Sequence, residues 1–160
     1  MNIATLVLHM HNYSFSGHSL RHLSALWLTE LLNTGAIGLL DSSLIHISLL
    51  PLTSLTLINA RQLTSDGLKH FSALRLTSLT LSNCHALSDA GIYYLSSMPL
   101  VELHLRGCSS LTYLALLYLK QCPLRKLDIR NPHSVSSDSV MRLLKLSKDV
   151  VVGVFVRTIF

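Results

Sequence analysis

Leucines recur along this chain with a spacing that predicts strands alternating with short helices. A six-residue pattern, Leu-x-x-Leu-x-Leu with one Ile in the last copy, returns every 24 residues and begins at Leu52, Leu76, Leu100 and Leu124. Its last two apolar residues alternate with polar ones, which is typical of a strand that buries one face. Later in the unit, apolar residues recur every three positions, as at Leu68, Phe71 and Leu74, and this spacing favours a helix.

Hydroxyl residues stand before each expected helix, and prolines stand after most of them. The hydroxyl positions are Thr64, Ser88, Thr112 and Ser136. A Thr or Ser side chain there can accept a hydrogen bond from a free backbone N–H group of the first helical turn, which makes it an N-cap. The prolines that mark the return to the next strand are Pro51, Pro99 and Pro123.

The same pattern is weaker in the first third of the chain. Residues 3–8 predict an earlier strand, and residues 22–26 (His-Leu-Ser-Ala-Leu) echo residues 70–74 (His-Phe-Ser-Ala-Leu). The unit at 28–51 fits at its ends but places Asn33 where a buried leucine is expected. Its strand is therefore the one that departs most from the pattern.

A strict 24-residue period predicts stacked repeats, because one strand and one short helix cannot bury their own leucines alone. We expect an α/β fold: a curved solenoid of about six repeats with an inner parallel β-sheet and outer short helices. The length suits a single domain over residues 1–160. Within it we expect regular repeats at 52–147, irregular repeats at 1–51 and a terminal capping strand at 150–156.

The unit that starts at Leu76 carries a recognisable motif. It reads Leu-x-x-Leu-x-Leu-x-x-Cys-x-x-Leu-Ser-Asp-Ala-Gly-Ile over residues 76–92, and the next unit places Cys108 at the same position and ends in Cys122-Pro123. This motif resembles the cysteine-containing class of leucine-rich repeat, carried by F-box/leucine-rich-repeat proteins and their relatives. No F-box is evident before the repeats. The resemblance implies a non-catalytic protein–protein interaction module, similar to the substrate-recognition part of a ubiquitin-ligase receptor or to a scaffold.

Composition narrows the classes of function. Apolar residues make up 49% of the 160 residues and charged residues only 13%. The net charge of +5 is spread along the sequence without a run of like charges, so no nucleic-acid-binding arm is indicated. No stretch of about 18 uninterrupted apolar residues is present, which speaks against a membrane span. We expect protein partners, with no nucleic acid and no membrane span.

The cysteines and the first residues bear on the compartment. The opening Met-Asn-Ile-Ala-Thr-Leu lacks the basic region and the cleavage site of a secretory signal. An odd number of cysteines, namely Cys84, Cys108 and Cys122, without an export signal favours reduced thiols. We therefore expect a cytoplasmic or nuclear protein. Because the chain opens almost directly into an apolar strand, we also expect a longer parent chain or a capping partner at its N-terminal edge.

Cysteines and histidines are the residues that invite a chemical interpretation. Cys84 and Cys108 stand where this repeat class buries a small side chain, so we interpret them as structural thiols. The short segment with His9, His11 and His18 lacks the second pair of ligands at fixed spacing that marks a metal site. No Gly-rich phosphate loop, nucleophile elbow or catalytic carboxylate pair is present. We expect no enzyme, no cofactor and no metal; the alternative from a different class is a thiol enzyme or a metal-binding protein.

The strand residues that point away from the core are the main candidates for partner binding. In two strands these are mostly small hydroxyl residues: Ser54, Thr56, Ile58, Ser78, Thr80 and Ser82. In the next two they are all charged or titratable, and we predict a partner-binding concave face at Glu102, His104, Arg106, Lys126, Asp128 and Arg130. The alternative is that these charges only solvate the sheet and complement one another across strands.

A second candidate surface lies on the expected helices. Helix positions beside the buried face carry apolar and aromatic residues: Tyr93, Tyr94, Leu117, Tyr118, Met141 and Leu144. Contiguous exposed apolar area often marks an interface. The alternative function is therefore a leucine-rich-repeat effector or adaptor that binds a host or signalling protein by its convex apolar face, through Tyr93, Tyr94, Leu117 and Tyr118.

Overall fold

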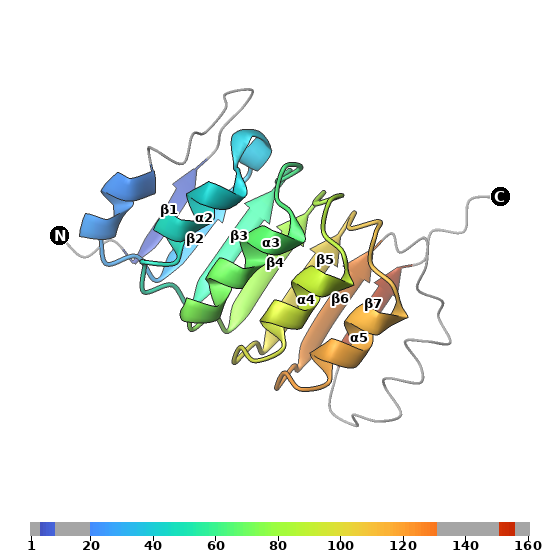
Figure 1. Ribbon diagram of the computed structural model, residues 1–160. Coiled ribbons are helices and arrows are strands. Elements are labelled where there is room, and N and C mark those ends of the chain that lie inside the picture. Colours follow the sequence, from blue (N-terminus) through green and yellow to red (C-terminus); the bar gives the residue numbers. More distant parts are fainter. Residues whose placement is uncertain (1–3, 9–19, 131–150, 156–160) are drawn as a thin grey trace.

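Seven parallel strands form one sheet in the order of the sequence (Figure 1). The structure, a computed structural model, describes residues 4–8, 20–130 and 151–155. The strands are β1 (Thr5–Leu8), β2 (Glu30–Asn33), β3 (Ser54–Ile58), β4 (Ser78–Ser82), β5 (Glu102–Arg106), β6 (Lys126–Arg130) and β7 (Val151–Phe155).

Short helices connect successive strands of the described chain. The α-helices are α2 (Asp41–Ile47), α3 (Ser65–Leu68), α4 (Asp89–Leu95) and α5 (Tyr113–Leu119). The 3-10 helices are η1 (Arg21–Ala25), η2 (Ala36–Gly38) and η3 (Lys69–Ala73). Figure 1 shows α2 to α5 on one side of the sheet. The expected α/β architecture with a single parallel sheet is confirmed, and the other face of the sheet, which we call the open face, carries no helix from α2 to α5.

The 24-residue period of the sequence is also the register of the sheet. Leu55 pairs with Leu79, which pairs with Leu103, which pairs with Leu127. All four side chains are fully buried. Each strand thus adds one leucine to a continuous buried column, and burial of one such side chain contributes roughly 1.5–3 kcal/mol.

Strand β2 forms despite the asparagine in its pattern. Asn33 pairs in register with Leu57 and is buried. Its side-chain oxygen accepts a hydrogen bond from the backbone N–H of Gly35 at 3.0 Å. A buried amide is costly only when its polar atoms have no partner, so this bond explains how asparagine replaces leucine here.

The predicted N-caps are confirmed at two of the three described positions. The hydroxyls of Thr64 and Thr112 accept hydrogen bonds from backbone N–H groups in the first turns of α3 and α5, each at 3.2 Å. The prediction for Ser88 is wrong, because its hydroxyl lies 2.9 Å from that of Ser65 and caps no N–H group of α4. The fourth predicted cap, Ser136, lies outside the described residues.

Side chains at the first residues of α2, α3 and α4 hold the next unit in place. The Asp89 carboxylate accepts hydrogen bonds from the backbone N–H of Thr112 at 2.8 Å and from its hydroxyl at 2.6 Å. Asp41 makes the same two bonds to Thr64, at 2.9 and 2.6 Å. In α3, the helix between α2 and α4, the Ser65 hydroxyl accepts one hydrogen bond, from the backbone N–H of Ser88 at 3.0 Å. Polar bonds therefore link neighbouring units beside the leucine column.

Replacing Asp89 by alanine tests this polar linkage. We expect the free energy of unfolding to fall by about 1–3 kcal/mol, because a charged acceptor of two hydrogen bonds is removed. Asp66→Ala is the matched control, since Asp66 is also in a first helical turn but is exposed. Urea denaturation measures both variants. Equal losses for the two would show that only the helix dipole matters here.

The strand expected at 150–156 is present as β7. It pairs in parallel with β6, with Lys126 opposite Val151 and Arg130 opposite Phe155. The helix expected from the sequence in the preceding unit, with Met141 and Leu144, falls outside the described residues. None of the helices in the described part of the chain is long and apolar enough to cross a membrane.

Candidate functional site

The structure brings all six predicted concave-face residues together on the open face of the sheet. They form three register pairs between β5 and β6: Glu102 with Lys126, His104 with Asp128, and Arg106 with Arg130. One difference from the prediction is the exposure of Asp128, which is only 6% exposed. Its neighbours cover it, so it is a buried charge beside two partly exposed arginine side chains.

Asp128 is the centre of this group. Arg106 donates to its Oδ2 from Nη2 at 2.7 Å and from Nε at 3.1 Å. Arg130 donates from Nε to Oδ1 at 3.0 Å and to Oδ2 at 3.2 Å. The His104 ring nitrogen Nδ1 lies 3.4 Å from Oδ2. Both guanidinium groups are therefore fixed by one carboxylate through charge-assisted hydrogen bonds.

The environment of Asp128 changes its protonation. Burial alone would raise the pKa of this carboxyl group, but the hydrogen bonds from Arg130, Arg106 and His104 outweigh burial and hold the pKa below its ordinary value. An acid with a lowered pKa stabilises the folded state when it is ionised. That stabilisation is complete above the ordinary pKa of about 4, and it is lost as the pH falls through the folded-state value.

Asp128→Asn is expected to lower the free energy of unfolding by about 1–2 kcal/mol at pH 7. This loss is at the low end of the range for hydrogen bonds to charged groups, because the two arginine partners are partly exposed to solvent. The difference between the two proteins should stay constant from pH 8 to about pH 5 and shrink below about pH 4. Urea denaturation across this range measures it. A difference that does not change with pH would contradict the assignment of Asp128 as an ionised hub.

The other charged side chains of the site are paired more loosely. Lys126 Nζ lies 3.6 Å from Glu102 Oε2, and His104 Nε2 lies 3.8 Å from the same oxygen. The charges thus complement one another across strands, as one of the two interpretations expects. This pairing leaves a surplus of positive charge, because three cationic residues, Arg106, Lys126 and Arg130, face two carboxylates.

Strands β3 and β4 extend the open face with small side chains. Ser54, Thr56, Ser78 and Thr80 are all half-buried and alternate with the leucines of the core. They carry no charge, so the ionic groups of the described sheet are concentrated on β5 and β6. An approaching chain would meet small hydroxyl groups on one side and fixed guanidinium groups on the other.

The predicted helix-face residues also lie together. The Tyr93 ring packs edge-on against Tyr94, with centroids 6.0 Å apart, and against Tyr118, with centroids 5.3 Å apart. Tyr93 is 57% exposed and Leu117 is at the margin of exposure, whereas Tyr118 packs partly against the core. The structure therefore shows an aromatic cluster on α4 and α5 with a single strongly exposed ring.

The thiols are in the places expected of structural cysteines. Cys84, Cys108 and Cys122 are all free and buried. The Cys84 thiol donates to the backbone oxygen of Ser82 at 3.6 Å, and hydrogen bonding with Cys108 together with burial raises its pKa well above the ordinary value. Burial raises the pKa of Cys122 to about 11. Cys84 and Cys122 are thus protonated at neutral pH, which is unfavourable for a nucleophile.

The metal interpretation is not supported by the residues that the structure describes. Those residues include no group of three or more His, Cys, Asp or Glu side chains that could hold an ion. The histidine-containing segment with His9, His11 and His18 lies outside the described residues.

Trp27 is the exposed aromatic residue that the repeat pattern does not single out. It is 71% exposed and is the only tryptophan of the chain. The sequence does contain one signal for this residue. Trp27 stands 24 residues before Pro51, at the position of the repeat that is occupied by proline in three later units. A bulky aromatic residue at such a return position cannot be explained by the buried column.

No protein-family model matches this chain, and no curated protein matches it.

Proposed function

We propose that this chain is a leucine-rich-repeat solenoid that binds another protein on the open face of its sheet and performs no catalysis. Three features of the fold support this proposal: strands that pair in sequence order, a 24-residue register and one buried leucine column. Stacked units of this kind expose a long row of strand residues. A row of this sort suits an extended contact with a protein surface.

The observation that carries the proposal is the fixing of Arg106 and Arg130 by the buried carboxylate of Asp128. Arginine side chains normally lose conformational freedom when they bind a partner, which costs roughly 0.5–1.5 kcal/mol each. Here that cost is met during folding. Guanidinium groups that are already oriented can receive a carboxylate of a partner with little further ordering.

The charge of the site indicates the chemistry of the partner. With three cations and two carboxylates, the site attracts acidic groups, and the neighbouring hydroxyls of Thr80 and Ser82 can bond to backbone groups. The resemblance of the repeats extends the proposal to a role like that of the substrate-recognition part of a ubiquitin-ligase receptor, or of a scaffold. In either role the bound protein would offer an acidic segment to β5 and β6.

A comparison of charge-neutralised variants tests this function. Arg106→Gln with Arg130→Gln is expected to weaken capture of an interacting protein from a lysate by about tenfold or more, and raised salt should weaken capture by the unmodified chain. Substitution by glutamate is unsuitable, because it would place a new carboxylate beside Asp128 and compromise folding.

The matched control is Arg61→Gln with Arg125→Gln, which removes the same charge from two exposed residues outside the strands. It should capture the same proteins as the unmodified chain. If the control and the Arg106 and Arg130 variant behave alike while both remain folded, the open face is not the binding surface.

The tyrosine cluster supports a second candidate function, binding of a host or signalling protein by the helix face. Its specific observation is the exposed Tyr93 ring held by two neighbouring rings. Binding through this face would depend on burial of apolar area. Tyr93→Ala would then abolish capture, with little dependence on salt, whereas the open-face proposal expects Tyr93→Ala to bind normally.

A further inference from the structure

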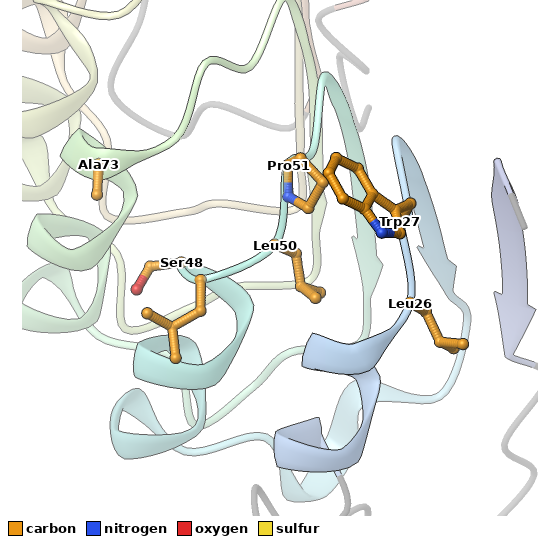
Figure 2. Close-up of a pocket in the computed structure, with 7 residues that line it drawn as sticks. Leu26, Trp27, Ser48, Leu50, Pro51 and Ala73 are labelled. Carbon is orange, nitrogen blue, oxygen red and sulfur yellow. The ribbon is translucent and has the colours of Figure 1, made fainter. Parts of the chain in front are cut away.

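A pocket lies where η1, α2 and η3 return to the sheet. Its volume is about 430 Å³, and its lining includes Leu26, Trp27, Leu49, Leu50, Pro51 and Ala73. Figure 2 shows that these residues come from the connection between η1 and β2, the connection between α2 and β3, and the end of η3. The pocket, which we call the Trp27 pocket, is separate from the charged strands β5 and β6.

Two of the lining side chains are exposed to an unusual degree. Trp27 is 71% exposed and Leu49 is 67% exposed, more than any other large apolar side chain in the described part of the chain. Single exposed apolar residues are common, but a tryptophan and a leucine that line one recess form a contiguous patch. Tryptophan is also a residue type that contributes strongly to binding when it becomes covered.

Positive charge accompanies the pocket. Arg75 follows the lining residue Ala73 by two positions and stands one 24-residue unit after Pro51. Lys69 begins η3, whose last residue is Ala73. Both are exposed, and neither takes part in an ion pair with the described residues, unlike Arg106 and Arg130.

One carboxylate of this region lies near Lys69. Asp66, in the first turn of α3, precedes Lys69 by three residues, whereas Asp41, in the first turn of α2, lies at the end opposite the return to the sheet. Glu30, on β2, accepts a hydrogen bond from the Thr5 hydroxyl at 3.0 Å. Arg75, whose connection to β4 carries no carboxylate, therefore favours a negatively charged partner.

We propose that the Trp27 pocket binds an acidic peptide segment of a partner protein, which inserts one large apolar side chain. That side chain contacts Trp27, Leu50 and Pro51, and a neighbouring carboxylate of the peptide faces Arg75. A recess favours an inserted side chain over a lipid surface, because a bilayer leaves a recess unfilled. The proposal does not depend on the function assigned to the open face.

Trp27 itself reports on binding, since it is the only tryptophan. The probe is the end-blocked peptide Glu-Glu-Phe-Glu-Glu, added to the full chain while Trp27 emission and its quenching by acrylamide are recorded. We expect the emission to shift to shorter wavelength and the quenching to fall. Glu-Glu-Ala-Glu-Glu and Lys-Lys-Phe-Lys-Lys should each bind about tenfold more weakly or worse.

Arg75→Glu is expected to weaken binding of Glu-Glu-Phe-Glu-Glu about tenfold, whereas Arg125→Glu, at an exposed arginine just before β6, should leave it unchanged. Thermal melting of both variants verifies that they are folded. Equal responses to all three peptides, no response to any, or unaltered binding by Arg75→Glu would overturn the proposal. So would a Trp27 shift produced by phosphatidylserine vesicles and not by the acidic peptide.

Discussion

Leu79→Ala is expected to lower the free energy of unfolding by about 2–5 kcal/mol. Leu79 lies on β4 in the middle of the leucine column, pairs with Leu55 and Leu103, and is fully buried. Its truncation leaves a cavity that the neighbouring leucines cannot fill without moving strands that are fixed in register. Urea denaturation measures the loss.

The matched control is the next residue of the same strand. Thr80 points to the open face and is half-buried, so Thr80→Ala should cost less than about 1 kcal/mol. The contrast between adjacent residues tests the strand alternation that the repeat pattern predicts. Similar losses at positions 79 and 80 would contradict it.

Removal of residues 150–160 is expected to destabilise the chain by about 3 kcal/mol or more and to lower its solubility. The deletion takes away β7, which pairs with β6 at five positions, and each lost backbone hydrogen bond costs about 1 kcal/mol. It also leaves β6 as an unprotected edge, and open edges promote association between chains. Thermal melting and sedimentation measure the two effects.

Deletion of residues 156–160 alone is the control, because it leaves β7 complete. This shorter deletion should melt close to the full chain. If the longer deletion also melts unchanged, β7 does not cap the sheet.

The strands could be predicted from the sequence because burial imposes a strict alternation on them. The leucines of β3 to β6 follow this alternation without exception in the buried column, so period and register coincide. Asn33 made the prediction of β2 weaker, because a polar residue breaks the pattern of buried leucines. The hydrogen bond that it accepts from the Gly35 N–H depends on the folded turn and could not be read from the sequence. Ser88 was misassigned as a cap because the competing hydroxyl of Ser65 comes from the preceding unit, 23 residues away.

The sequence could predict which residues belong to the candidate site, but not how their side chains contact one another. Alternation along β5 and β6 placed all six residues on one face. It could not show that Asp128 is buried under two arginines, because side-chain direction across strands depends on the three-dimensional neighbours. The Trp27 pocket escaped prediction for a similar reason, since three connections between helices and strands form it and none has a distinctive pattern alone.

The most direct test of the open face as a binding surface is site-specific photo-crosslinking in cells. A photoreactive amino acid is placed either at Thr80, beside His104 in the sheet register, or at Leu117 on the helix face. If the open face binds a partner, position 80 gives a discrete protein adduct that disappears when Arg106→Gln and Arg130→Gln are added. Adducts from position 117 alone, or an adduct from position 80 that survives the loss of both arginines, would contradict it.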